Sequence, residues 1–297
     1  MPLIFFTEDL FMNRNFASLM SIRFRLSALT IMVLSAVLFT SCGKSMTKLL
    51  KNPDAAYKLR MAEQFFVKKS YVKAQQVYED IMPFYKTSKE FEDIYYKYAY
   101  CAYNLSDYSN AENLFKSYLE IFPTSSRAEE IDYMRAYCYF KQSPKAQLDQ
   151  TPTVKAMGMM QTFINTHPGS PRNKEASEII DQCRVKLETK DYLGAQLYYD
   201  LGQFRAAGVA FTSLLNSFAE SARADEYKLM VVKSYFRYAE LSIEEKKVER
   251  YEQVINECYE FIDRYPESKF RKEIDNFINL SQNNIKILTN EQTKTPA

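Results

Sequence analysis

The chain has 297 residues, 39 Lys and Arg against 37 Asp and Glu, and only 6 glycines. So few glycines disfavour β-proteins, Rossmann folds and P-loops, which place glycine in their turns and phosphate-binding loops. The near-neutral charge argues against a nucleic-acid-binding protein. Hydrophobic residues make up 46% of the chain and aromatic residues 15%, enough to build a sizeable core. The composition therefore predicts a folded, all-helical protein.

The N-terminal segment resembles a bacterial lipoprotein signal. Arg23 and Arg25 form a short basic stretch, the 14 residues 26–39 carry no charge, and Cys42 follows shortly after. A helix of that length spans ~21 Å, less than the ~30 Å hydrocarbon core of a bilayer but normal for the apolar part of a signal peptide. The resemblance implies a signal peptide over residues 1–41 and a covalent N-acyl diglyceride with palmitate on Cys42.

Two features of this segment leave alternatives open. Phe39 stands where lipoprotein signals usually have Leu, so an ordinary signal peptide followed by an unrelated cysteine is the alternative. The acidic residues within 1–19 do not suit the basic start of a signal, and we expect Met20 to be the true start and residues 1–19 an over-long gene reading.

By the same resemblance, Gly43 favours the outer membrane, and the basic residues after it favour its periplasmic face.

The body of the chain repeats one pattern three times. The pattern Ala-x8-[Tyr/Phe]-x2-Ala-x3-[Tyr/Phe] begins at Ala62, Ala99 and Ala195. Small residues at this spacing suit the close approach of two antiparallel helices, and the aromatic residues fill the space beside them. The pattern is similar to the tetratricopeptide repeat, which implies an all-α, right-handed superhelix, or solenoid, of about five helix pairs. Helix-ending prolines support the division; they are Pro123, Pro168 and Pro266.

The repeats predict the following order along the chain. A polar tether comes first, then the solenoid, with an added helical stretch that continues into the fourth pair, and a terminal helix that closes the array. We expect the tether over 42–53, the solenoid over 54–287 with pairs at 54–86, 91–123, 128–168, 190–219 and 222–266, the added stretch at 172–188, the terminal helix at 268–287, and a disordered tail over 288–297. Helix starts are predicted at two capping boxes, Thr87 with Glu90 and Ser126 with Glu129, and more weakly at Ser170, Ser221 and Ser268.

The whole combination resembles the BamD family, the tetratricopeptide-repeat lipoproteins of the outer-membrane β-barrel assembly machinery. The resemblance covers residues 42 to about 280 and includes an insertion with Asp149-Gln-Thr-Pro in the third pair. It implies a scaffold on the periplasmic face of the outer membrane. Its implied partners are the periplasmic domains of the β-barrel insertase and unfolded outer-membrane proteins, for folding and insertion. The alternatives are another tetratricopeptide-type lipoprotein, either a glycan-capturing uptake partner or a cell-envelope division factor.

No residue pattern predicts catalysis, a cofactor or a metal. The chain has a single His and no GxGxxG, P-loop, HExxH or CxxC motif, and His167 fills a position that aromatic residues occupy in other repeats. We therefore predict that the protein is not an enzyme. Four cysteines follow Cys42, and we expect buried free thiols because packed helices usually hold Cα atoms too far apart for a disulfide; they are Cys101, Cys138, Cys183 and Cys258.

Aromatic residues gather at the positions that line the concave surface of a tetratricopeptide array. The first helix of each pair faces this groove, and its groove positions are rich in Tyr and Phe in the first three pairs. An aromatic ladder there would hold an extended peptide, whereas the alternative is that the rings only pack helix on helix. The candidates are Phe66 in the first pair, Tyr96, Tyr100 and Tyr103 in the second, and Tyr133, Tyr137 and Phe140 in the third.

Overall fold

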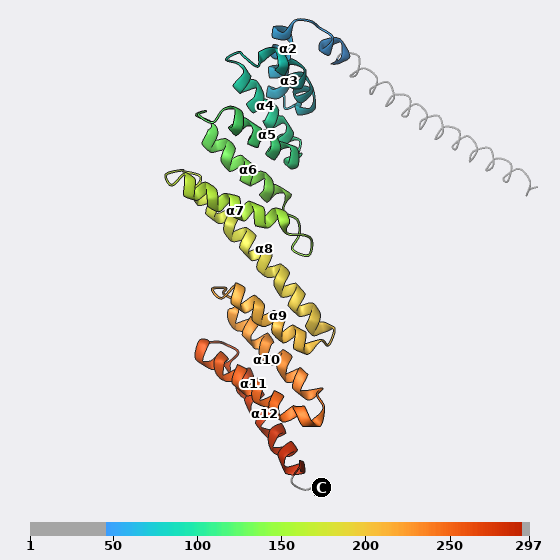
Figure 1. The fold of residues 1–297 in the computed structure, drawn as a ribbon, viewed down its shortest axis with the longest axis vertical. Helices are drawn as coiled ribbons and strands as arrows, with labels where there is room; N and C mark the ends of the chain where they lie inside the picture. The colour runs from blue at the N-terminus through green and yellow to red at the C-terminus, as the bar shows by residue number, and fades with distance from the viewer. Residues whose placement is uncertain (1–45, 293–297) are drawn as a thin grey trace, which may run out of the picture. The chain divides into compact units, whose positions relative to one another are not determined.

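The computed structural model of the protein describes residues 46–292. All regular secondary structure in this range is helical (Figure 1). The predicted signal peptide, Cys42 and the last five residues lie outside the described residues. The chain divides into two compact units between Thr124 and Ser125, and each unit is described by itself.

The first unit consists of two helix pairs preceded by a short helical segment, 46–50. Each helix packs against the next one along the chain. Ala62 and Ala74, the two small residues of the first repeat, are both fully buried, so the helices of this pair approach closely there, as predicted. The helices are α2 (Ala55–Val67), α3 (Tyr71–Tyr85), α4 (Phe91–Asn104) and α5 (Tyr108–Ile121).

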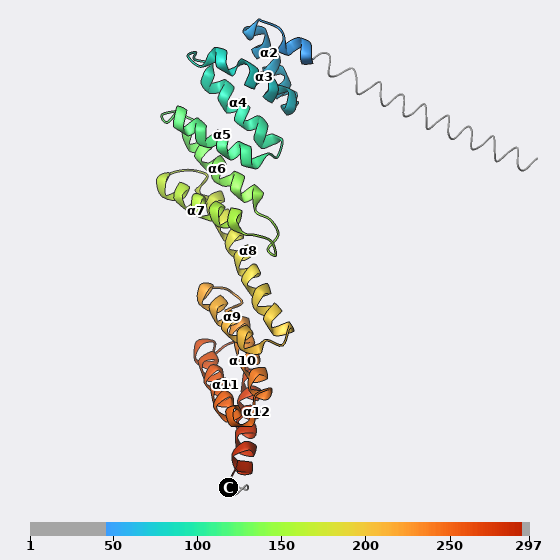
Figure 2. The same ribbon diagram turned by 45° about the vertical axis from the view of Figure 1, so that its right-hand side comes forward.

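The second unit continues the same arrangement over seven helices of its described residues. Successive helices pack on one another, and α10 also contacts α12 (Figure 2). Ala195 and Ala207 of the third repeat are buried in its core. The helices are α6 (Ala128–Gln142), α7 (Thr151–Thr166), α8 (Asn173–Asp200), α9 (Phe204–Ser217), α10 (Ala224–Glu240), α11 (Glu244–Arg264) and α12 (Arg271–Gln292).

Helix α8 is the one departure from regular pairing, and it agrees with the prediction that the added stretch runs into the fourth pair. Its 28 residues contain no proline, so nothing in the backbone interrupts the helix. The helix packs against both α7 and α9, and Figures 1 and 2 show these two helices beside different parts of its length. One long helix thus joins the irregular third pair to the regular array that follows.

The ends of the array differ from the predicted boundaries. Residues 46–50, expected in the tether, are helical, and Leu49 is only 7% exposed because it packs into the core of the first unit. Helix α12 extends to Gln292, into the expected tail, and Leu288 packs against the core of the second unit. The folded region is longer than predicted at both ends because these apolar side chains pack against the core.

Neither predicted capping box forms. Helix α4 begins at Phe91 with Glu90 as its N-cap, and α6 begins at Ala128 with Arg127 as its N-cap; neither N-cap side chain accepts a capping hydrogen bond. Before α6, α8, α10 and α12, a serine three residues ahead of the first helical residue orders the turn, because its hydroxyl oxygen accepts the backbone N–H two residues further on. This contact joins Ser125 to Arg127, Ser170 to Arg172, Ser221 to Arg223 and Ser268 to Phe270.

Candidate peptide-binding surface

The first aromatic row consists of Tyr96, Tyr100 and Tyr103 on α4. Helical spacing places these three residues on one face, and their rings touch in sequence. Ring centroids lie 4.6 Å apart between Tyr96 and Tyr100 and 6.2 Å apart between Tyr100 and Tyr103. All three side chains are half-buried. The row therefore keeps part of its aromatic surface accessible while its rings hold one another in place.

Helix α5 supports the first aromatic row from beneath. The Tyr100 ring meets Phe115 edge to face at 5.2 Å, and the Tyr103 ring meets Tyr108 at 5.6 Å. Phe115 is fully buried, so it holds the centre of the row in a fixed position. Such edge-to-face contacts add about 0.5–1.5 kcal/mol each beyond the area they bury. The row is thus a pre-ordered surface as well as a packing element.

Phe66 occupies the corresponding helix of the first pair. Its ring packs against Tyr71 at 5.7 Å and Tyr78 at 6.4 Å, and it is half-buried in the core of the first unit. The Tyr78 hydroxyl donates a 3.0 Å hydrogen bond to Glu63. Burial, followed by the Glu63 charge, raises the pKa of Tyr78. Phe66 therefore packs within its own pair and, like the tyrosines of the first aromatic row, is half-buried, so it stays a candidate.

An ion-paired lysine lies between the first two pairs. Lys97 Nζ lies 2.6 Å from Glu63 and 2.7 Å from Asp93. Burial lowers the pKa of Lys97, but hydrogen bonds to the two carboxylates outweigh it and raise the pKa overall. The lysine stays charged, and its ion pair with Glu63 joins α4 to α2 within the first unit.

The second aromatic row lies on α6 in the second unit. Tyr133 and Tyr137 stack with centroids 5.8 Å apart and planes at 19°, and Phe140 continues the row at 5.8 Å from Tyr137. Tyr133 is only 2% exposed, with its ring between Phe163 at 5.5 Å and the Arg172 guanidinium at 5.1 Å. The prediction of Tyr133 as a groove residue is therefore wrong, because the neighbouring α7 and the start of α8 cover it.

Six of the seven predicted site residues thus form two rows, one in each unit, while Phe66 stands on α2 of the first unit. Tyr137 and Phe140 are half-buried and remain candidates in the second row, as Tyr96, Tyr100 and Tyr103 do in the first. The sequence pattern predicts one ladder of all seven aromatic residues. Exposure separates them, because it depends on which neighbouring helix covers each ring.

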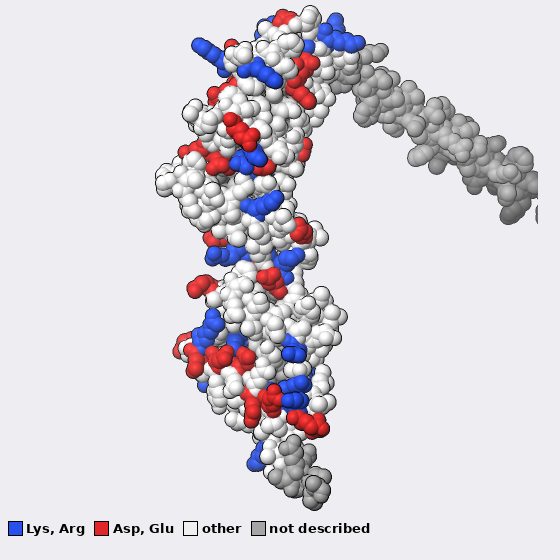
Figure 3. All heavy atoms as spheres, in the orientation of Figure 1, with Lys and Arg blue, Asp and Glu red and all other residues white. Residues whose placement is uncertain are grey.

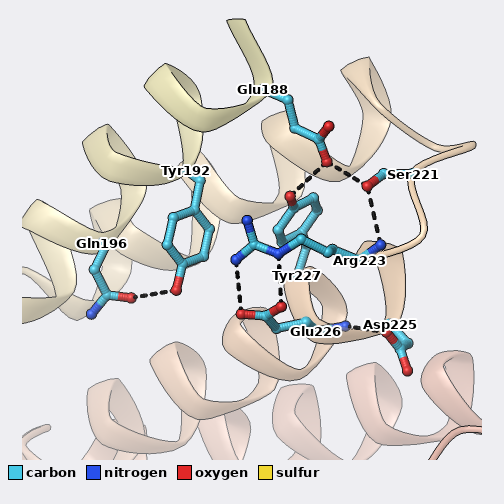
Figure 4. A network of polar contacts seen from close by, with 8 residues as sticks. All are labelled: Glu188, Tyr192, Gln196, Ser221, Arg223, Asp225, Glu226 and Tyr227. Atoms are coloured by element: carbon cyan, nitrogen blue, oxygen red, sulfur yellow. Dashed lines mark hydrogen bonds and ion pairs between the residues drawn. The ribbon is translucent and has the colours of Figure 1, made fainter. Parts of the chain in front are cut away.

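A polar network that the sequence pattern did not predict connects α8 to the turn before α10 (Figure 4). Glu188 accepts hydrogen bonds from the Ser221 hydroxyl and, at 2.6 Å, from the Tyr227 hydroxyl. The Arg223 guanidinium lies 4.4 Å from the Tyr192 ring centroid and 2.9 Å from Glu226. A pocket of about 600 Å³ lies alongside, lined by α8, the end of α9 and the turn. Of the residues in this network, only Ser221 was named in the sequence analysis, as a predicted helix start.

His167 and the four cysteines pack against neighbouring side chains. The His167 ring lies 4.9 Å from Phe163, in agreement with its predicted space-filling role, and Nε2 lies 3.4 Å from Asp132. The four cysteines of the described residues are free and buried, as predicted. Burial raises the pKa of Cys101 and of Cys258 to about 12, so both thiols stay protonated and unreactive near neutral pH.

The described residues contain neither a membrane-spanning helix nor a candidate metal site. None of the described helices is both long and apolar enough to cross a bilayer. Within residues 46–292, no group of three His, Cys, Asp or Glu side chains is arranged to hold a metal ion.

Comparison with known proteins places the chain in a family. The family model "YfiO: Outer membrane lipoprotein" matches residues 51–235, whereas no curated protein sequence matches. One similar solved structure is titled "TPR2AB-domain:pHSP90-complex of yeast Sti1"; it is 13% identical, covers 77% of this chain and 98% of its own, and has a TM-score of 0.35. That likeness is too weak to inform function. The family match spans well over half of the chain, which therefore belongs to the YfiO, or BamD, family of outer membrane lipoproteins.

Proposed function

We propose that this protein is a lipid-anchored scaffold of outer-membrane protein assembly. In this role it binds the periplasmic domains of the β-barrel insertase and holds unfolded outer-membrane proteins for folding and insertion. Membership of an outer membrane lipoprotein family supports the location. The first aromatic row on α4 is the observation that carries the substrate-binding part of the proposal. The role needs no catalytic residue and no cofactor.

The spacing of the first aromatic row suits an extended peptide. Along α4, Tyr96 and Tyr100 are separated by a rise of ~6 Å, while side chains on one face of an extended strand repeat every ~6.7 Å. The rings of Tyr96 and Tyr100 therefore match successive side chains on one face of the peptide, whereas Tyr103, with a rise of only ~4.5 Å from Tyr100, extends the aromatic surface beside them. Tyrosine combines an apolar ring with a polar hydroxyl, so the rings pack on side chains while the hydroxyls meet backbone groups of the peptide.

The aromatic surface also suits the chemistry of the substrate class. Outer-membrane barrels end in strands with alternating aromatic residues, and aromatic pairs favour offset or edge-to-face packing. Because the row is already ordered by Phe115 and Tyr108, binding costs little side-chain entropy on the protein's side. Acylation of Cys42 would hold this surface near the membrane into which the substrate inserts.

Affinity purification from solubilised outer membrane tests the proposal. We expect the tagged, full-length chain to recover a β-barrel insertase with periplasmic repeat domains, and depletion of the chain to lower the whole set of outer-membrane barrels. A tagged, unrelated outer-membrane lipoprotein is the control. Recovery of only a glycan transporter, with loss of a single uptake system on depletion, would show that the protein serves nutrient uptake instead.

A further inference from the structure

We propose that a pocket at the N-terminal end of the first unit binds anionic phospholipid of the membrane to which the protein is anchored. The pocket has a volume of about 320 Å³ and lies where residues 46–50 meet α2 and the start of α3. Its lining combines an apolar floor with two lysines. The residues that matter are Leu49, Tyr57, Met61 and Phe65 on the floor and Lys48 and Lys73 at the cationic positions.

The floor of the pocket is one face of α2. Tyr57, Met61 and Phe65 are spaced four residues apart, so they lie above one another on the helix surface. Leu49 packs into the core beside them, and Tyr57 remains 38% exposed. Because the helical segment 46–50 packs here, the floor becomes a recess rather than a flat face. Such an apolar recess suits the acyl part of a lipid.

The lysines add a cationic rim. Lys73 Nζ lies 5.7 Å from the centroid of the Phe65 ring, and Lys48 is exposed. The lysines that form ion pairs in the described part of the first unit are Lys58, Lys97 and Lys116, so the two pocket lysines keep their charge available. An apolar floor with a cationic rim complements the two parts of an anionic phospholipid, its chains and its phosphate.

Charge is also concentrated in this part of the chain. Residues 46–73 contain seven Lys and Arg against two Asp and Glu, whereas the whole chain holds 39 against 37. Figure 3 shows several Lys and Arg side chains on the visible face of the N-terminal helices, at the top of the view. Basic residues near an anionic surface attract it over about one Debye length, ~8 Å at physiological salt. The excess of positive charge thus favours a membrane surface over a neutral partner.

The position of the pocket along the chain brings it to the membrane. Cys42 precedes Met46 by four residues, which reach at most ~14 Å when extended, and the headgroup layer is itself ~5–8 Å thick. The first described residue is therefore held close to the lipid headgroups. This step rests on the proposed acylation of Cys42, but the following experiment does not.

A fluorescence measurement tests lipid binding directly. The mature chain with Cys42→Ala carries no acyl group, and because the protein contains no Trp, Tyr57→Trp places a single reporter in the pocket. We expect its emission to shift to the blue with vesicles of phosphatidylethanolamine and phosphatidylglycerol, and to stay unchanged with phosphatidylcholine vesicles. Phe84→Trp, at a side chain that is 71% exposed near the end of α3, is the control and should not respond. Equal shifts with both kinds of vesicle would overturn the proposal.

Matched charge variants separate the pocket from general attraction. In the Tyr57→Trp background, Lys48→Gln with Lys73→Gln should lower the vesicle partition coefficient about thirtyfold. Lys86→Gln with Lys89→Gln removes the same charge from the exposed turn after α3 and should have little effect. Circular dichroism checks that both variants fold. An equal loss in the two variants would refute the pocket, and neither result depends on the anchor or on peptide binding.

Discussion

The hydroxyl of Ser268, in the turn before α12, donates a 2.7 Å hydrogen bond to the carboxylate of Asp225 at the start of α10. The same hydroxyl oxygen accepts the backbone N–H of Phe270. One serine thus orders its own turn and joins it to an earlier helix. The arrangement recurs where Ser170 donates to Glu129 on α6 and where Ser221 donates to Glu188 on α8. These serines connect successive helix pairs of the second unit.

Loss of this connection should destabilise the second unit. Ser268→Ala removes a hydrogen bond to a carboxylate and leaves Asp225 without it, so we expect a loss of ~1.5–3 kcal/mol of unfolding free energy. Urea unfolding followed by circular dichroism measures the loss. Ser126→Ala is the control, because Ser126 is exposed and is not the N-cap of α6. Equal stability of Ser268→Ala and the parent protein would show that the turn is held by its backbone alone.

Two glycines in helices should respond oppositely to the same substitution. A Cβ at Gly208 on α9 would lie 2.9 Å from Cζ of Tyr235 on α10, whereas a Cβ at Gly194 on α8 would meet nothing within 4 Å. Gly208→Ala should therefore destabilise the protein by ~1–3 kcal/mol through overpacking. Gly194→Ala should stabilise it by up to ~1 kcal/mol, because alanine favours a helix.

Thermal unfolding of the two alanine variants measures both effects. The melting temperature should fall for Gly208→Ala and rise for Gly194→Ala. A rise for both would mean that the Tyr235 ring moves aside at little cost, and that α9 and α10 do not need their close approach.

Buried tyrosines should make the protein sensitive to alkali. Burial is the main cause that raises the pKa of Tyr78, Tyr133 and Tyr227 above the ordinary value of 10.0. The unfolded chain then loses these protons at a lower pH than the folded chain, so the folded state binds more protons and stability falls as pH rises above ~10.

A conservative variant tests this linkage. Tyr227→Phe should reduce the alkaline slope of unfolding free energy by up to ~1.4 kcal/mol per pH unit above pH ~10, although it also loses the hydrogen bond to Glu188. Tyr259→Phe is the control, because Tyr259 is 50% exposed and should leave the slope unchanged. Urea unfolding at several alkaline pH values gives the slope, and identical slopes in both variants would contradict the assignment.

Peptide binding should depend on the centre of the first aromatic row. Tyr100→Ser removes the ring that contacts both Tyr96 and Tyr103, and we expect it to weaken binding of a barrel C-terminal peptide by ~1–3 kcal/mol. Tyr137→Ser tests the second row in the same way. Fluorescence anisotropy of a labelled peptide measures the affinity, with Tyr259→Ser as the control. Unchanged affinity with a native helix signal would mean that the rings serve packing alone.

Acylation of Cys42 should determine where the protein resides. Cys42→Ala should release the chain into the soluble periplasmic fraction or leave its signal peptide uncleaved. Fractionation with a labelled fatty acid reports both location and acylation. Label incorporation into the Cys42→Ala chain, with unchanged mature size, would place the lipid on another residue. Retention without label would indicate that partners alone hold the protein at the membrane.

The sequence by itself determined the helix order and the approximate extent of the helix pairs, but not the helix starts at the two expected capping boxes or the two ends of the array. Ala62 and Ala74 marked the first close approach, and the prolines and serines of the junctions marked the turns, because these signals act through local backbone geometry. The added helical stretch was correctly predicted to continue into the fourth pair as α8. The presence of the aromatic rows was likewise readable from helical spacing alone.

Only the tertiary structure decided which aromatic and apolar residues are accessible. Tyr133 and Tyr137 lie one turn apart on the same face of α6, yet α7 and the start of α8 cover Tyr133 and leave Tyr137 half-buried. Leu49 was predicted to lie in the tether, but it packs into the core of the first unit. Exposure depends on contacts between segments distant in sequence, and the local pattern of residues does not encode which neighbour will cover a given side chain.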